Sequence, residues 1–322
     1  MVVRLPDELL TGPFHRRRAL ELGISARVLE GRRFTRVHPS VYRHRDHLMT
    51  FDDEVKAAGL ALPAEAQPTG VTRLQTAGVA FGPRFPLRFV VEGDLHLALD
   101  RVFLHRTVLL PPLDDAGVTL CAAFVALCAR ATTIDAVGVG DTLLARRLMS
   151  TDELADLASN AEWRAGAREA LWVGQHLDDR SRSFRESALR AMIGFSGLPP
   201  PEPNAPVLDA AGPHADLWFP GFRTAVEYEG SQHQTHRPQY VADVDRYQLY
   251  RDHDIRYVLV TRESLASPKT VVRQIHAVLV RGGYHGPPPD FGAAWDLLMG
   301  RLSRAVPPRR RSRAVRQPPF HG

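Results

Sequence analysis

The sequence predicts a mixed α/β protein, and the order of elements in its first and last thirds leads to this prediction. The first 48 residues pair short helices with a small hairpin, while the last third places strands before a helix and a further strand. A hairpin joins antiparallel strands, whereas a helix between two strands allows them to be parallel. Residues 51–178 mix strands and helices, so we expect an α+β region between these two parts.

The N-terminal block has the order helix, tight turn, helix, hairpin. Residues 14–22 predict a helix that a glycine ends, and Ser25 is suited to cap a second helix through Arg32. A hairpin is expected over residues 34–43, turned at a Pro-Ser pair. This order is that of a winged helix-turn-helix, so residues 1–48 form the first predicted domain.

The middle block, residues 51–178, carries no group of residues with catalytic spacing. Ser150 and Glu153 have the spacing of a capping box, which predicts the start of one of its helices. We expect strands over residues 85–91 and 102–106, and helices over residues 119–130, 134–147, 151–159 and 163–176.

The third predicted domain, residues 181–285, begins with a helix and continues as a mixed sheet. Pro220-Gly221 predicts a two-residue turn in the middle of a hairpin. We expect helices over residues 184–195, 238–252 and 268–281, and strands over residues 207–209, 214–219, 222–229 and 255–261. A C-terminal helix and a disordered, proline- and arginine-rich tail are expected over residues 286–322.

The positive charge of the chain is almost entirely arginine. The formal net charge is +5, and Lys56 and Lys269 are its two lysines. Arginine presents a planar fork that suits phosphate, which keeps nucleic acid among the expected partners. Codon usage in a genome rich in G and C would give the same bias. The charge alone therefore does not decide the function.

The sequence contains no apolar run of about 18 residues and no apolar signal segment near its start, so we expect no membrane partner. Cys121 and Cys128 are seven positions apart in a segment expected to be helical, which separates them by about 10 Å. That distance is too long for a disulfide, so they are expected to be buried thiols in a reducing compartment. We expect the protein to be cytoplasmic.

Acidic residues gather on one face of the C-terminal hairpin. With Phe219 opposite Phe222, Asp216 would face Ala225, and Asp216, Glu227 and Glu229 would share one side of the sheet. Asp216 and Glu227 would then lie about 7–8 Å apart at Cβ, a separation that a divalent cation can span.

Carboxylates crowded on a strand face repel one another, and a bound cation relieves that repulsion. Mg²⁺ prefers oxygen ligands, neutralises the charge that develops during phosphodiester cleavage and activates water. The alternative is a solvent-facing hairpin whose acids only confer solubility. The hairpin therefore predicts a Mg²⁺ or Mn²⁺ site, formed by Asp216, Glu227 and Glu229.

The stretch from Asp216 through Glu227-Tyr228-Glu229-Gly230 to His233, then Asp243 and Arg246, then the strand ending at Thr261, resembles a known nuclease family. It is similar to the relatives of very-short-patch-repair endonucleases within the PD-(D/E)XK, restriction-endonuclease-like superfamily. The resemblance covers about 100 residues, from Ser183 to about Ala277. It implies a restriction-endonuclease-like mixed sheet flanked by helices.

By this resemblance Asp216 is the metal-binding aspartate and Glu227 is the acid of the E-x-K element. Glu229 stands where the family often has lysine, which leaves the general base open. His233 is our candidate for base or metal ligand, with a simple hydrogen-bonding histidine as the alternative. Glu186 lies where related enzymes carry an extra acid, although its spacing from Ser183 also suits a helix cap.

The N-terminal block resembles the winged helix that opens AbiEi-type antitoxins of toxin–antitoxin systems. The matching stretches are Phe14-His15-Arg16-Arg17-Arg18-Ala19, Leu22-Gly23-Ile24-Ser25, Phe34-Thr35-Arg36-Val37 and Val41-Tyr42-Arg43. A second helix carrying Arg27, Arg32 and Arg33 would enter a DNA major groove, with Arg36 and Arg43 of the wing on the backbone. The alternative is a winged domain used for protein contacts, whose arginines form a solvated face.

Two functions remain at this point. The first is a Mg²⁺-dependent DNA endonuclease, a hydrolase that the winged helix directs to DNA. The second is an AbiEi-like antitoxin or transcription regulator whose nuclease-like domain is inactive. A homodimer and a partner toxin are further candidate partners, and the sequence contains no pattern that tests either of them.

Overall fold

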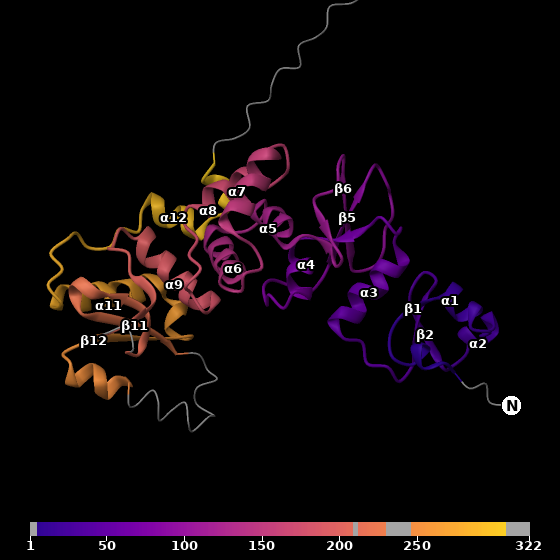
Figure 1. Ribbon diagram of the computed structural model, residues 1–322, viewed down its shortest axis with the longest axis horizontal. Helices are drawn as coiled ribbons and strands as arrows, with labels where there is room; N and C mark the ends of the chain where they lie inside the picture. The colour runs from indigo at the N-terminus through magenta and orange to yellow at the C-terminus, as the bar shows by residue number, and fades with distance from the viewer. Residues whose placement is uncertain (1–4, 209–211, 230–245, 307–322) are drawn as a thin grey trace, which may run out of the picture.

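The computed structural model describes residues 5–208, 212–229 and 246–306 and confirms the mixed α/β class. The elements follow one another along a long axis, from the N-terminal block at one end to a four-stranded sheet at the other (Figure 1). No helix in the described ranges has the length and apolar character needed to cross a membrane.

The N-terminal block is built around a three-stranded sheet with the order β1-β3-β2. Its elements are η1 (Asp7–Leu9), β1 (Phe14–His15), α1 (Arg16–Glu21), α2 (Ala26–Leu29), β2 (Phe34–His38) and β3 (Val41–His44). Phe14 is buried and contacts Phe34 edge to face, which joins the first strand to the hairpin. The block has a small hydrophobic core of its own, made of Leu5, Leu9, Phe14, Ala19, Ile24, Leu29 and Phe34.

Both predicted helices of this block are shorter than the sequence indicated. Phe14 pairs with Tyr42 in the sheet, so the first helix begins only at Arg16, with His15 as its N-cap. The second helix ends at Leu29, and the following residues turn into β2. The prediction that Arg32 and Arg33 lie on a helix with Arg27 was therefore wrong, because both residues belong to the turn.

The middle block begins with α3 (Phe51–Ala61), whose N-cap Thr50 and Asp53 form a capping box. Next come β4 (Gln67–Pro68), α4 (Gly70–Thr76), β5 (Leu87–Glu92), β6 (Val102–Thr107), β7 (Leu113–Asp114) and β8 (Gly117–Val118). The helices are α5 (Leu120–Cys128), α6 (Thr133–Ala145), α7 (Thr151–Asn160) and α8 (Ala167–Gly174). Ser150 accepts the Glu153 N–H at 3.0 Å, as its spacing predicted. Both cysteines are free and buried.

The C-terminal sheet has the order β12-β11-β10-β9, with β11 and β12 parallel and the other pairs antiparallel. The strands are β9 (Glu202–Pro206), β10 (His214–Phe219), β11 (Thr224–Glu229) and β12 (Arg256–Thr261). The helices and turns around them are α9 (Phe184–Phe195), η2 (Pro220–Phe222), η4 (Ser264–Ala266), α11 (Pro268–Arg281), α12 (Ala293–Met299) and η5 (Leu302–Arg304). Helix α11 and the helical residues 246–252 lie on opposite sides of this sheet (Figure 1).

Two local predictions in this sheet were wrong. The first strand runs over residues 202–206 instead of 207–209, although it contains Pro203 and Pro206. It lies at the edge of the sheet, where a residue without an N–H is tolerated. The turn after Phe219 is also longer than two residues, because η2 and the left-handed Arg223 (φ 45°) complete it.

The middle helices and the C-terminal sheet share one hydrophobic core, which is continuous across the boundary near residue 180. Helix α6 carries Asp141 and α9 carries Arg190, whose Nη2 donates to the Asp141 carboxylate at 2.8 Å. Asp141 is fully buried and also accepts the backbone N–H of Asp178 at 2.8 Å. This ion pair therefore fastens the C-terminal sheet region to the middle block.

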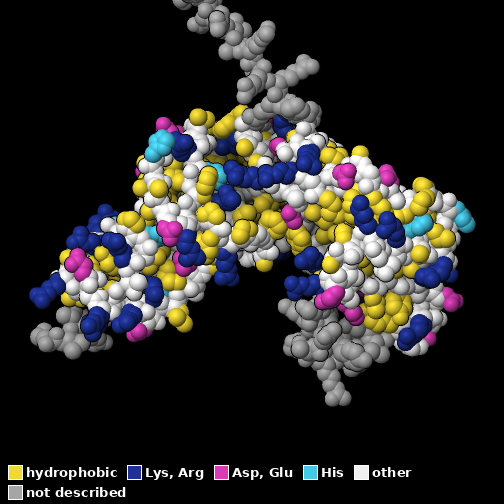
Figure 2. All heavy atoms as spheres, turned by 180° about the vertical axis from the view of Figure 1, so that it is seen from behind, with side chains coloured by type: hydrophobic (Ala, Val, Ile, Leu, Met, Phe, Trp, Pro, Cys, Tyr) yellow, Lys and Arg dark blue, Asp and Glu magenta, His cyan; other side chains and the backbone are white. Residues whose placement is uncertain are grey.

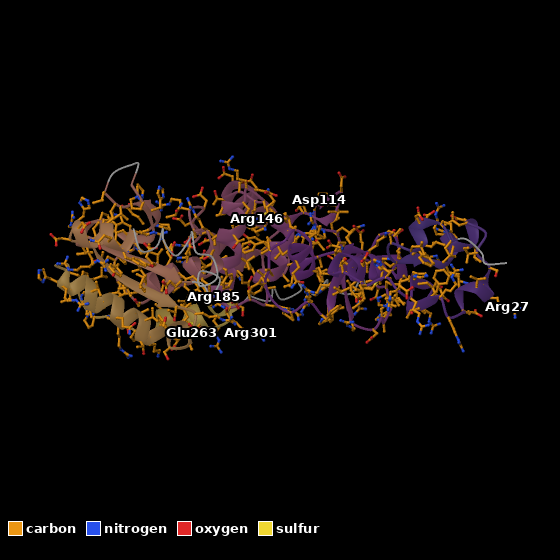
Figure 3. The ribbon with its side chains drawn as sticks, turned by 90° about the horizontal axis from the view of Figure 1, so that it is seen from below. Arg27, Asp114, Arg146, Arg185, Glu263 and Arg301 are labelled. Carbon is orange, nitrogen blue, oxygen red and sulfur yellow. The ribbon has the colours of Figure 1, made fainter. Side chains whose placement is uncertain are left out.

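Replacing Arg190 with methionine should lower the free energy of unfolding by about 3–5 kcal/mol at pH 7, because it leaves a buried carboxylate without its cation. Urea denaturation monitored by circular dichroism measures the change. Arg185→Met is the matched control, since Arg185 is an exposed residue of the same helix (Figure 3) and should change stability by less than about 0.5 kcal/mol. A loss below about 1 kcal/mol for Arg190→Met would show that the pair is not structural.

Candidate active site on the C-terminal sheet

The two central strands place the predicted acids together on one face. Leu217 pairs with Val226 and Trp218 with Ala225, and the next pair in this register is Asp216 with Glu227. Side chains alternate along each strand, so Asp216, Glu227 and Glu229 share a face, while Leu217 and Val226 point into the main core on the other.

The predicted pairing of Asp216 with Ala225 was wrong by two positions, because the turn is two residues longer than expected. A shift of two residues leaves every side chain on its original face, whereas a shift of one would have reversed them all. The prediction that the acids share one side of the sheet is therefore consistent with the observed register.

Glu227 is a buried carboxylate, with 2 % of the residue exposed. Its Oε1 accepts the hydroxyl of Tyr250 at 2.6 Å, and its Oε2 accepts Nη1 of Arg246 at 3.2 Å. Both partners come from the helical residues 246–252, which pack Tyr250 against this face of the sheet. One helix thus holds both oxygens of the acid.

Two of the acids carry pKa values shifted in the same direction. Burial raises the pKa of Glu227 to about 7, with repulsion from Asp216 as the second cause. Burial and repulsion from Asp216 likewise raise the pKa of Glu186. Asp216 therefore lies close enough to both acids to disfavour their charged forms. Asp216 on β10 thus lies near both Glu186 of α9 and Glu227 of β11.

Glu186 combines this position with a local structural role. Its backbone N–H donates to the Ser183 hydroxyl at 3.2 Å, which is one half of the predicted capping box. Its own carboxylate accepts the N–H of Arg182 at 2.9 Å, so it caps one residue earlier than a reciprocal box would. Glu186 therefore both caps the start of α9 and lies near Asp216.

Asp216 is half-buried and ends the ladder between β10 and β11. Its Oδ2 accepts the backbone N–H of Tyr228 at 2.7 Å, which fixes the carboxylate beside the last residues of β11. Glu229 follows at the end of that strand and is half-buried. His233 and Asp243 lie outside the described residues.

The donor set consists of carboxylate oxygens, the ligands that Mg²⁺ and Mn²⁺ prefer, and its members repel one another in the absence of a cation. Within residues 5–208, 212–229 and 246–306, no group of three or more His, Cys, Asp or Glu side chains is arranged as a metal site.

Tyr250 is a residue of this site that the sequence analysis missed. Its hydroxyl is buried, and burial together with the neighbouring Glu227 raises its pKa beyond the usual range of tyrosine. The signal available in the sequence was its spacing from Arg246, because positions i and i+4 of a helix share a face. Arg246, which belongs to the stretch that resembles the nuclease family, forms an ion pair with Glu227.

The arginines predicted to contact DNA differ in exposure and in partners. Arg27, Arg32 and Arg36 are exposed, and Arg27 marks the outer end of the N-terminal block (Figure 3). Basic side chains gather over this block, with acidic ones among them (Figure 2). Arg33 is half-buried. Arg43 donates from Nη1 to the carbonyls of residues 44, 45 and 47 at 3.2, 2.9 and 2.6 Å, so it holds the chain after β3.

No model of a known protein family matches this chain, and no curated protein is similar to it.

The raised pKa of Glu227 makes stability depend on pH. Between its ordinary value near 4.5 and its folded value near 7, the folded state keeps a proton that the unfolded state releases. Stability from this group is therefore complete below pH 4.5 and is lost as the pH rises through 7, by up to about 3 kcal/mol. Urea denaturation at pH 5 and pH 8 in the presence of a chelator should show this loss in the wild type.

Glu227→Gln should flatten this profile, because glutamine does not titrate. Glu202→Gln, an exposed acid on the same sheet, serves as the control and should keep the wild-type profile. If the wild type and Glu227→Gln lost the same free energy between the two pH values, the buried acid would not be the group responsible.

Proposed function

We propose that this protein is a divalent-metal-dependent DNA endonuclease whose active site is the acidic face of the C-terminal sheet. The observation that supports the proposal is the buried Glu227, which lies near Asp216 and accepts a hydrogen bond from a buried tyrosine, with Glu186 also near Asp216 and the pKa values of Glu186 and Glu227 raised. Like charges gathered in a partly buried place are costly, and clusters of this kind mark functional sites. The proposed fold is the restriction-endonuclease-like one that the sequence resembles.

Asp216 and Glu227 would hold the ion, with Glu229 assisting at the end of the strand. When bound, Mg²⁺ or Mn²⁺ supplies charge neutralisation at the phosphate and a more acidic water. Tyr250 fixes the Glu227 carboxylate through its hydroxyl, and Arg246 brings a guanidinium to the same acid. His233 is proposed as the proton carrier by resemblance alone.

For the N-terminal block we propose a DNA-binding winged helix. The order β1-α1-α2-β2-β3 with a β1-β3-β2 sheet supports this assignment, as does a separate core. Arg27, Arg32 and Arg36 are exposed and are proposed to contact phosphates. Arg43 is assigned to the structure of the wing instead, because its guanidinium binds backbone carbonyls.

A second candidate function is a DNA-binding regulator of the antitoxin type with an inactive nuclease-like domain. The ion pair between Arg246 and Glu227 favours it, since the arginine gives the buried acid a positive partner without any metal. The absence of lysine at the position of Glu229 favours the same interpretation. DNA binding without cleavage in any divalent metal is its signature.

Purified protein should nick supercoiled plasmid in Mg²⁺ or Mn²⁺, and Asp216→Ala should lower the rate by about 100-fold or more. The reason is that a metal ion contributes several kcal/mol of charge stabilisation, and each 1.36 kcal/mol is a factor of ten. Gel electrophoresis of the plasmid at timed intervals measures the rate.

Glu202→Gln is the matched control for this assay, because it removes an exposed acid from the edge strand of the same sheet. It should nick like the wild type. Nicking that survives Asp216→Ala would come from a contaminant or from another site. Plasmid binding with no nicking in either metal would favour the second candidate function, the DNA-binding regulator.

DNA affinity should fall when Arg27, Arg32 and Arg36 are all replaced by glutamine. Each lost phosphate contact weakens binding and lowers the salt dependence by about one unit of slope. Fluorescence anisotropy with a labelled duplex between 50 and 200 mM salt (roughly the range over which such slopes are resolved) measures both effects. The control is the same triple change at the exposed Arg84, Arg281 and Arg304, and equal losses in both triples would refute a specific surface.

A further inference from the structure

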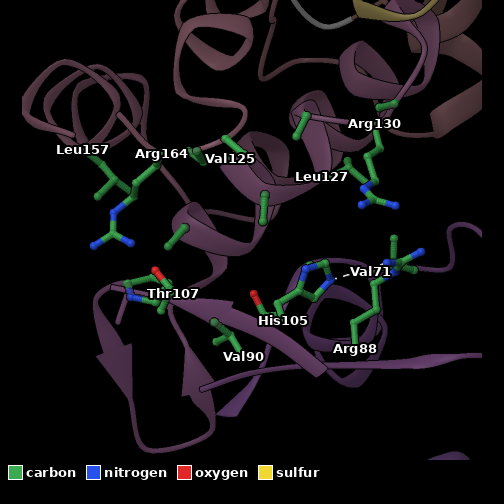
Figure 4. A pocket seen from close by; sticks show the side chains of 18 of the residues that line it. Val71, Arg88, Val90, His105, Thr107, Val125, Leu127, Arg130, Leu157 and Arg164 are labelled. Carbon is green, nitrogen blue, oxygen red and sulfur yellow. Dashed lines mark hydrogen bonds between the residues drawn. The ribbon is translucent and has the colours of Figure 1, made fainter. Parts of the chain in front are cut away.

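The middle block contains a cavity of about 480 Å³ that is separate from the acidic face of the C-terminal sheet (Figure 4). Strands β5 and β6 form one wall, through Arg88, Val90 and His105, and helix α5 forms the opposite wall, through Val125 and its neighbours. A cavity of this size is in the range of small-molecule sites in proteins, which lie at about 300–1,000 Å³.

Two arginines line this cavity without a carboxylate partner. Among the described residues, neither Arg88 nor Arg130 forms an ion pair, although Asp135 also lines the cavity. Burial lowers the pKa of Arg88, and repulsion from Arg130 lowers it further. The two guanidinium groups thus act on each other as like charges, which an anion between them would relieve.

His105 adds a neutral hydrogen-bonding group beside these charges. Burial lowers its pKa to about 4, and repulsion from Arg88 and Arg130 acts in the same direction. Its Nε2 lies 3.5 Å from Nη1 of Arg88, and because a guanidinium can only donate, this nitrogen accepts (Figure 4). The imidazole is therefore uncharged near pH 7 and does not take the place of an anion.

The rest of the lining is largely apolar. Val71, Val90, Val125 and Leu157 surround the cavity, and the exposed Trp163 stands at its rim with the Arg164 guanidinium 4.3 Å from its ring centre. Arg164 is itself bound to the carbonyls of Leu109 and Leu110, at 3.0 and 2.9 Å. Apolar walls with a few convergent polar groups are typical of sites for organic ligands.

We propose that this cavity binds a small organic anion, with a phosphate or carboxylate head between Arg88 and Arg130 and an apolar body against Val90, Val125 and Leu157. The paired arginines recognise the head, because guanidinium groups match both oxyanions in geometry. The apolar walls recognise the body by excluding water from it. The site does not depend on the nuclease proposal, since it shares no residue with the acidic face.

Isothermal titration calorimetry on the full chain tests the proposal with three probes of one shape: 1-naphthyl phosphate, 1-naphthoate and the uncharged 1-naphthol. At least one anion should bind with a Kd below about 1 mM, a free energy near −4 kcal/mol, and at least tenfold more tightly than 1-naphthol. Failure of both anions to bind, or equal binding of 1-naphthol, would overturn the proposal.

Arg88→Met and Arg130→Met should each weaken binding of the anion by about tenfold or more, which is the loss of one charge-assisted contact. Arg84→Met is the matched control, because Arg84 is an exposed arginine just before β5 and does not line the cavity. It should bind like the wild type. If Arg84→Met weakened binding of the anion equally, the effect would come from the overall charge of the protein and not from the cavity.

The thermal melting of the ligand-free variants separates binding from folding. Relief of the repulsion between the two arginines should leave Arg88→Met and Arg130→Met melting at or above the wild-type temperature. Arg130 is exposed, so its variant tests the site even if Arg88→Met were to misfold. A lower melting temperature for Arg130→Met would assign the arginine to the structure and overturn its binding role.

Discussion

The burial of the Glu227 carboxylate is the constraint on which the C-terminal sheet depends. A buried acid must be hydrogen-bonded or paired, and both of its partners, Tyr250 and Arg246, come from the helical residues 246–252. That helix is thereby fixed against one face of the sheet, while α9 and α11 cover the other with apolar side chains. Both faces of the sheet are packed, and the acids lie on the face that Tyr250 covers, next to the buried Trp218 and Ala225.

The face of each acid could be predicted from the sequence, but its exact opposite residue could not. Alternation along a strand depends only on neighbouring residues, whereas the pairing depends on the length of the turn, which Arg223 extends by adopting a left-handed conformation. Other elements show the same difference between local features, which the sequence predicts, and features that depend on position in the sheet. Local capping at Ser150 was predicted correctly, whereas the strand over residues 202–206 was not, because only its edge position in the sheet admits two prolines.

Contacts between distant segments are the part that sequence patterns do not reveal. Tyr250 and Glu227 are 23 positions apart, and the spacing of Tyr250 from Arg246 indicates a shared helix face but not the acid that both residues contact. Arg190 and Asp141 are 49 positions apart, and their pair crosses a boundary that composition alone suggested between two domains. The hydrophobic core that spans this boundary could not be predicted either, because burial depends on packing between distant segments and not on order along the chain.

The two proposed functions differ in what balances the negative charge on the acidic face. Arg246 supplies one positive group, and its side chain is 30 % exposed, whereas the Glu227 side chain is 3 % exposed and fixed by Tyr250. Because Glu227 is buried, loss of Arg246 alone would leave a carboxylate without its positive partner, which is costly unless another cation takes its place. A divalent cation bound at Glu227 would supply that positive charge and would free the Arg246 guanidinium for a phosphate. The ion pair that favours an inactive protein is equally suited to the resting state of an active one.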